Sequence, residues 1–187
     1  MGKNYIMSER KKIATVWLGG CSGCHMSLLD IDERLLDLAK LADIVKCPIV
    51  DHKELPEVDI TLVEGAITSD EHLHEIRNIR RKSKAVVALG DCAVMTNVTG
   101  MRNYFNLQDV IDTAYVHAAS DDGQGKVPNH AALLKLHQKV YALHEAVKID
   151  FVIPGCPPSA DTIFYVLNEF LNDRVPDLNE VKKLKYG

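Results

Sequence analysis

The stretch IATVWLGGCSGC, residues 13–24, places a short apolar run directly before a glycine-rich segment that contains two cysteines. Ile13–Leu18 has the length and composition of a buried strand, because the run is apolar and rich in β-branched and aromatic side chains. The glycines that follow favour the start of a loop. The sequence therefore predicts a first strand whose carboxyl end carries Cys21 and Cys24.

Strands and helices alternate along the rest of the chain. Further strands are predicted at Asp43–Val50, Asp59–Val63, Lys84–Leu89 and Asp150–Ile153, and helices at Ser27–Ala42, Ser69–Lys82 and Ser159–Leu171. This alternation is typical of the α/β class and predicts a flavodoxin-like, doubly wound parallel sheet with helices on both faces. Asn97–Lys148 is less regular, and we interpret it as an irregular insertion before the last strand, with a helix at Ala131–Leu143.

The composition indicates one globular domain over residues 1–187. The chain is 47% hydrophobic and 26% charged, which excludes intrinsic disorder for most of its length. A net charge of −4 argues against a nucleic-acid partner, because a chain that binds phosphates should be basic. The apolar runs are too short for a membrane span, and no signal peptide is recognised, so we expect a cytoplasmic protein.

Four of the five cysteines follow predicted strands. Cys21 and Cys24 follow the first strand, Cys92 follows the fourth within GDC, and Cys156 follows the fifth within PGCPP. Loops at the carboxyl ends of parallel strands open on one edge of a sheet, so these thiols should converge. Disulfides are not expected in a reducing compartment. Four converging thiolates suit a structural zinc ion or a [4Fe–4S] cluster.

The spacing of the cysteines favours the cluster over zinc. Structural zinc sites usually pair two CxxC motifs, whereas this chain has one CxxC and two isolated cysteines in loops rich in glycine and proline. A dithiol redox motif would use Cys21 and Cys24 but would leave Cys92 and Cys156 without a role. Cys47 is interpreted as a buried apolar residue, with metal ligation as a minor alternative.

Two further polar residues are expected near the cysteines. Glu64 follows the third strand and should emerge on the same edge, either to accept hydrogen bonds from loop N–H groups or to place a negative charge beside a cluster. His25 follows Cys24, and we expect it on the surface. No Rossmann or Walker motif follows the first strand, and no Ser-His-Asp arrangement is recognised, so no catalytic residue is predicted.

Four motifs, taken together, resemble the small subunit of [NiFe] hydrogenases. They are Cys21-Ser22-Gly23-Cys24, Val63-Glu64-Gly65-Ala66, Gly90-Asp91-Cys92-Ala93 and Pro154-Gly155-Cys156-Pro157-Pro158. Their order is similar to that family over residues 13–171. The resemblance implies that Cys21, Cys24, Cys92 and Cys156 hold the [4Fe–4S] cluster nearest the nickel–iron centre of the large subunit. It also implies that Glu64 lies near this cluster without being a ligand.

Within that family, the chain resembles the short small subunits of cytoplasmic NAD-reducing, or bidirectional, hydrogenases. The twin-arginine signal and the C-terminal cysteine-rich domain of the long periplasmic members are not found, and Leu29–Leu36 and Gly100–Asn103 also look like the short subgroup. The resemblance implies a large subunit with the Ni–Fe centre, and diaphorase subunits that carry FMN, bind NAD and hold further Fe–S clusters. Because this chain has no paired CxxC motifs for nickel, it should not activate hydrogen alone.

A related family is the cluster-bearing subunit of respiratory complex I, next to the quinone site. That subunit usually has two adjacent cysteines where this chain has Cys21-Ser22-Gly23-Cys24, so the spacing argues against it. A zinc-stabilised interaction domain also stays open. The edge that carries the cysteines should be apolar and covered by the large subunit, and the residues expected there are Gly19, Gly20, Met26, Met95, Val98 and Met101.

Overall fold

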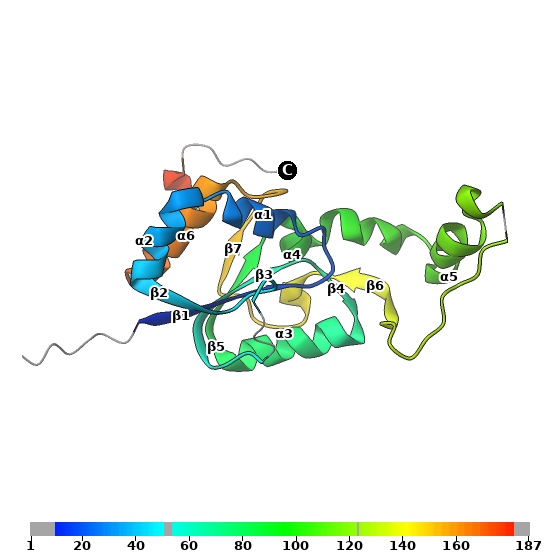
Figure 1. Cartoon of the computed structure of the whole chain (residues 1–187), viewed down its shortest axis with the longest axis horizontal. Helices are drawn as coiled ribbons and strands as arrows, with labels where there is room; N and C mark the ends of the chain where they lie inside the picture. Colours follow the sequence, from blue (N-terminus) through cyan, green and yellow to red (C-terminus); the bar gives the residue numbers. More distant parts are fainter. Residues whose placement is uncertain (1–9, 51–53, 123, 182–187) are drawn as a thin grey trace, which may run out of the picture.

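The central sheet has the predicted α/β architecture. A computed structural model describes residues 10–50, 54–122 and 124–181 (Figure 1). Five strands pair in parallel in the order β2–β1–β3–β5–β7, which is the flavodoxin-like order and confirms the predicted fold class. The strands are β1 (Lys11–Trp17), β2 (Ala42–Lys46), β3 (Val58–Glu64), β5 (Ser83–Leu89) and β7 (Phe151–Ile153).

Helices cover both faces of this sheet. On one face lie α1 (Gly23–Leu29), α2 (Leu35–Leu41) and α6 (Ala160–Leu171), and on the other face lies α3 (Asp70–Lys82) (Figure 1). Successive side chains of a strand point to opposite faces. Leu62 of β3 therefore joins the core with Ile163 of α6, whereas its neighbour Val63 joins the core with Ile76 of α3.

The predicted helix Ser27–Ala42 is wrong in its extent. The segment forms α1 and α2 with a 3-10 turn, η1 (Asp32–Arg34), between them. Asp32 has φ of +55°, and a residue in this left-handed conformation interrupts a right-handed helix. The second strand is also shorter than predicted, because the chain turns after Lys46 and the N–H of Val50 donates to the carbonyl of Cys47.

The insertion forms a small antiparallel sheet with an earlier segment, which the sequence did not predict. β6 (Leu136–Tyr141) of the insertion pairs with β4 (Ile67–Ser69), so the predicted helix Ala131–Leu143 is wrong. α4 (Asp91–Met95) precedes the insertion, and η6 (Leu178–Glu180) follows α6. The insertion also contains η2 (Asn97–Tyr104), α5 (Leu107–Ile111), the π-helical turn η3 (Asp112–Val116), η4 (Ala119–Asp121) and η5 (Leu143–Glu145).

Part of the insertion projects from the body of the protein. This arm, defined as residues 97–122 and 124–135, extends beyond β4 and β6 and carries α5 at its far end (Figure 1). In the described part of the chain, none of the helices is both long and apolar enough for a bilayer crossing.

Candidate metal-cluster site

The carboxyl ends of four adjacent strands lie level with one another. The residues that pair across the sheet at this level are Trp17, Glu64, Leu89 and Ile153. The loops after β1, β5 and β7 carry the four cysteines singled out by sequence, namely Cys21, Cys24, Cys92 and Cys156. The parallel register therefore starts these loops from one edge of the sheet, which we call the cysteine edge, together with the Glu64–Ala66 turn after β3.

The loop after β1 is fastened to the turn after β3. The N–H of Gly19 donates to the carbonyl of Ala66 at 3.0 Å, and the N–H of Ala66 donates back to Gly19 at 2.8 Å. Gly65 between them has φ of +87°, and a Cβ there would lie 2.9 Å from the carbonyl carbon of Gly19. Both its conformation and this close approach require glycine.

The loops that carry Cys92 and Cys156 are joined to each other. The N–H of Asp91 donates to the carbonyl of Gly155 at 2.9 Å, and the N–H of Gly155 donates to Oδ1 of the buried Asp91 at 2.7 Å. The N–H of Gly90 donates to the carbonyl of Ile153 at 2.8 Å. These bonds fix the two cysteine-bearing loops relative to one another.

The other three thiols lie close enough to Cys24 to affect its pKa. Cys24 is buried, Cys92 is half-buried, and Cys21 and Cys156 are exposed. Burial is the largest cause that raises the pKa of Cys24 above its ordinary value, and the charges of Glu64 and of the other three thiols raise it further. The structure therefore brings together all four cysteines that the sequence singled out.

Burial also raises the pKa of Cys92. A hydrogen bond from the Thr99 backbone opposes that rise, whereas the charges of Cys156, Cys21 and Glu64 add to it. A metal ligand must be deprotonated, so the raised pKa values of Cys24 and Cys92 oppose ligation unless the charge of a cation stabilises the thiolates.

Two glycines make room for sulfur at this edge. A Cβ at Gly90, where φ is +81°, would lie 2.2 Å from Sγ of Cys24, and a Cβ at Gly23 would lie 3.3 Å from Sγ of Cys21. The sulfur of Cys24 thus occupies the space that a side chain at position 90 would fill. A set of four thiols in glycine-rich loops fits the ligands of an iron–sulfur cluster.

Glu64 is a buried carboxylate that holds the first turn of α1. Its Oε2 accepts from the N–H of His25 at 3.0 Å, and its Oε1 accepts from the N–H of Cys24 at 3.4 Å. The first N–H groups of a helix have no partner within the helix, so a carboxylate satisfies them and complements the helix dipole. The predicted role of Glu64 as an acceptor for loop N–H groups is confirmed.

The prediction that His25 lies on the surface is wrong. The side chain is 2% exposed, its Nδ1 lies 2.5 Å from Oε2 of Glu64, and its ring packs edge-on against Trp17 with centroids 5.3 Å apart. The partner lies 39 residues away in sequence, so local spacing does not reveal the bond.

Cys47 stands apart from the other four cysteines. It is half-buried and lines a separate cavity behind α1.

Across the described residues, no group of three or more His, Cys, Asp or Glu side chains is placed to hold a single metal ion.

The fold is that of a flavodoxin-like domain that carries four cysteines on the loops at one edge of its sheet. A sequence model of the family described as NADH ubiquinone oxidoreductase, 20 Kd subunit, matches residues 21–170, and the chain belongs to this family. The CxxC spacing, which argued against the complex I subunit, therefore does not place the chain outside that subunit's family.

The resemblance to hydrogenase small subunits is confirmed by curated relatives. The chain is 41% identical over 170 residues to the NAD-reducing hydrogenase HoxS subunit delta of Cupriavidus necator, covering 89% of this chain and 81% of that one. It is 37% identical over 168 residues to a subunit of the F420-non-reducing hydrogenase of Methanothermobacter marburgensis, covering 88% of this chain and 54% of that one. The chain thus spans about half of the second relative.

Solved structures agree with this relation. A chain of an NAD⁺-reducing [NiFe]-hydrogenase in the H₂-reduced state superposes with a TM-score of 0.90 at 34% identity, over 95% of this chain and 99% of that one. The [NiFeSe] hydrogenase of Desulfovibrio vulgaris Hildenborough shares the fold, with a TM-score of 0.55 at 18% identity over 89% of this chain and 61% of that one.

Proposed function

We propose that this chain is the electron-transfer small subunit of a cytoplasmic NAD-reducing [NiFe] hydrogenase, which catalyses H₂ + NAD⁺ = NADH + H⁺. Cys21, Cys24, Cys92 and Cys156 would hold one [4Fe–4S] cluster. When bound, such a cluster supplies one-electron redox chemistry between the Ni–Fe centre of the large subunit and the diaphorase. The observation that carries the proposal is the convergence of four thiols on one sheet edge in a chain so similar to the HoxS delta chain.

The protein's own residues position the proposed ligands. Glu64 fixes the backbone of Cys24, and Asp91 fixes the loop before Cys156. Gly90 leaves the space that the Cys24 sulfur occupies. The role of this chain is therefore to hold the ligands and to set their surroundings, while the Ni–Fe centre, FMN, NAD and further Fe–S clusters belong to partner subunits.

Exposed apolar side chains near the cysteine edge support a large-subunit partner. Four of the residues expected there are between 50% and 62% exposed, namely Met26, Met95, Val98 and Met101. Methionine is a flexible apolar side chain that suits interfaces. We expect the large subunit to cover this edge with a contact that buries roughly 2,000 Å² or more, as obligate partners do.

The metal content of anaerobically purified protein tests the proposal. The chain should carry about four irons, be brown and lack stoichiometric zinc. Cys156→Ala should lose or convert the cluster, as judged by iron content and electron paramagnetic resonance. Cys47→Ala is the matched control, because it removes a thiol away from the cysteine edge, and it should keep both. Colourless protein with one zinc per chain would instead support the zinc-stabilised interaction domain.

Affinity purification tests the partners. A tagged chain should retain a nickel-containing large subunit together with flavin-containing diaphorase chains. Capture of a quinone-reactive membrane assembly instead of the large subunit and the diaphorase chains would favour the complex I-like alternative. The family match is consistent with that alternative.

The charge of Glu64 gives a finer test within the assembled complex. Glu64 adds to the electrostatic cost of charging Cys24, so its carboxylate lies close to the proposed cluster. Glu64→Gln removes one negative charge and keeps an acceptor oxygen for the N–H groups of α1. A negative charge disfavours the addition of an electron, so the substitution should raise the reduction potential. An unchanged potential in a redox titration would leave Glu64 with its backbone role alone.

A further inference from the structure

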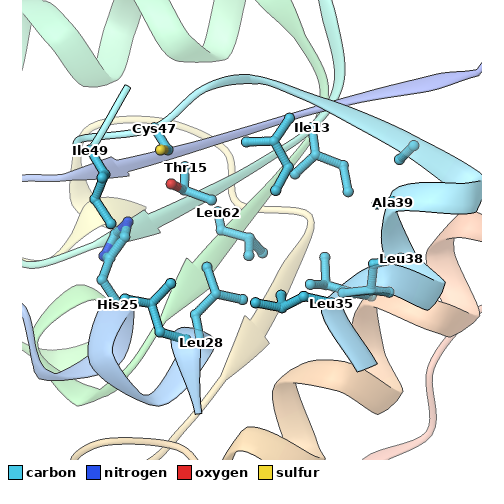
Figure 2. A pocket seen from close by; sticks show the side chains of 14 residues that line it. Ile13, Thr15, His25, Leu28, Leu35, Leu38, Ala39, Cys47, Ile49 and Leu62 are labelled. Carbon is cyan, nitrogen blue, oxygen red and sulfur yellow. The ribbon is translucent and has the colours of Figure 1, made fainter. Parts of the chain in front are cut away.

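The cavity that Cys47 lines has no part in the proposed cluster site, because none of the four proposed ligands lines it. It has a volume of about 100 Å³ and lies between the sheet and helices α1 and α2 (Figure 2). Most of its lining is aliphatic, from Ile13, Leu28, Leu35, Leu38, Leu62 and Leu167. Figure 2 shows the ring of His25, the hydroxyl of Thr15 and the sulfur of Cys47 gathered at one end, away from Leu35 and Leu38.

Two polar atoms at this end have no partner. Oγ1 of Thr15 and Nε2 of His25 are buried, and within the described part of the chain neither makes a hydrogen bond. Both residues are 2% exposed and both line the cavity. Buried polar atoms are almost always hydrogen-bonded, so two unpaired atoms facing one cavity point to a ligand that satisfies both.

The orientation of His25 is fixed from the opposite side of its ring. Nδ1 lies 2.5 Å from Oε2 of Glu64, and the ring packs against Trp17, so rotation of the ring would break the bond to the carboxylate. Nε2 is thereby held toward the cavity. A ligand hydroxyl can both donate and accept a hydrogen bond. It can therefore bond to Nε2 of His25 and to Oγ1 of Thr15, whichever of these two atoms acts as the donor.

We infer that this cavity binds a small uncharged molecule that carries one hydroxyl group on an apolar body, of the size of a phenol. No Asp, Glu, Lys or Arg is among the lining residues, so a charged ligand would have no counter-charge. The cavity is somewhat smaller than the roughly 150 Å³ cavity that accepts benzene in an engineered protein. Water is the competing occupant, because it too can bond both polar atoms.

The cavity has an apolar entrance. Leu29, Ile44 and Ile49 line it and are 42%, 53% and 62% exposed, so a ligand can enter past them without opening the core. Ile49 lies beside His25 and Cys47 in Figure 2, so the polar end of the cavity is close to this entrance, and the apolar body of a ligand would extend toward Leu35 and Leu38.

Binding of 4-fluorophenol to the anaerobically purified full chain, in whatever assembly it retains, tests the inference by fluorine magnetic resonance. We expect saturable binding at one site, and binding about tenfold weaker for 4-fluorotoluene, which has a methyl in place of the hydroxyl. Thr15→Val keeps the side-chain volume and should weaken the binding of 4-fluorophenol by a similar factor. Leu28→Phe should fill the cavity and abolish binding.

Thr61→Val is the matched control for Thr15→Val. Thr61 lies on the same sheet, but its hydroxyl bonds Ser83 at 2.7 Å and it does not line the cavity, so affinity should be unchanged. Saturating 4-fluorophenol should also slow alkylation of Cys47, measured by mass spectrometry on the unsubstituted protein.

Three results would overturn the inference. The first is a lack of saturable binding of 4-fluorophenol. The second is equal affinity for 4-fluorotoluene and 4-fluorophenol, which would mean that water bonds the two polar atoms. The third is binding of 4-fluorophenol that survives Leu28→Phe and does not protect Cys47.

Discussion

The cysteine edge of the five-stranded sheet and the arm, which leads into β6 of the two-stranded sheet, are built in opposite ways. At the cysteine edge, reciprocal backbone bonds join Gly19 to Ala66, and a buried carboxylate on Asp91 holds Gly155. The arm is held at its root and beyond that exposes large apolar side chains, with Tyr104 87% and Phe105 64% exposed. Contacts within this chain thus fix the geometry of the cysteine edge, whereas the large apolar side chains of the arm stay exposed.

The largest effect on iron content should come from a substitution that fills the space behind the Cys24 sulfur. Gly90→Ala places a Cβ 2.2 Å from Sγ of Cys24 at a φ of +81° and should cause most chains to lose iron. Alanine in this conformation alone costs about 1–3 kcal/mol, and the added Cβ would also overlap the sulfur. Iron per chain after anaerobic purification measures the effect.

Gly100→Ala, at the start of the arm, is the matched substitution. Its Cβ would lie 2.1 Å from Oγ1 of Thr96, but that contact is with a side chain rather than with a proposed ligand. Iron content should therefore fall much less than in Gly90→Ala, because only the backbone hydrogen bond from the neighbouring Thr99 to Cys92 links this turn to a proposed ligand. Equal iron loss in Gly90→Ala and Gly100→Ala would contradict the expected difference between the cysteine edge and the arm.

The root of the arm should matter for stability without affecting iron. Nδ2 of Asn103 donates to the carbonyl of Val140 at 2.9 Å, and Oδ1 of Asn103 accepts from the N–H of Val140 at 2.7 Å. Asn103→Ala leaves both backbone groups of Val140 without this partner and should lower the free energy of unfolding by about 1–3 kcal/mol. Denaturant unfolding measures the loss, and a parallel fall in iron content would contradict the separation of the two regions.

The buried thiol of the edge should make the metal-free chain sensitive to alkali. Burial raises the folded-state pKa of Cys24, whereas in the unfolded chain a thiol has a pKa of about 8.5. Above that pH the unfolded state binds fewer protons than the folded state, so stability falls as pH rises, by at most about 1.4 kcal/mol per pH unit for one proton. Denaturant unfolding between pH 7 and 10 should show a shallower decline for Cys24→Ala, and the same decline as the parent for Cys47→Ala.

The smallest effect on the chain itself is expected at the tip of η2. Tyr104→Ser removes an exposed ring, so the free energy of unfolding should change by less than about 0.5 kcal/mol. Recovery of the large subunit in affinity purification should nevertheless fall if the arm contacts that partner. Normal recovery of every partner would show that the exposed ring serves no interface.

The sheet and the cysteine edge were predictable from sequence for the same reason. β1, β3 and β5 are buried on both faces and therefore consist mostly of apolar residues. The shared direction of β1, β5 and β7 places Cys21, Cys92 and Cys156 at one edge. Glu64 was placed correctly because it ends β3. These positions follow from local pattern and from the parallel topology.

The features that were missed depend on distant partners. Leu136, Val140 and Leu143 recur at helical spacing, yet the segment pairs with β4, because a strand partner far away in sequence overrides local periodicity. β4 itself is only three residues long. His25 is buried because Glu64 bonds its ring, and no pattern within α1 reveals that contact.

The bridge between Asp91 and Gly155 has a consequence for how tightly a ligand can be held. The two residues are 64 positions apart, and closing a flexible loop of that length costs conformational entropy of about 3.7 kcal/mol. Hydrogen bonds of the protein itself contribute to closing this loop and to holding Cys92 near Cys156. We therefore expect the proposed cluster to add less to the stability of this chain than a metal adds in small domains that fold only around it.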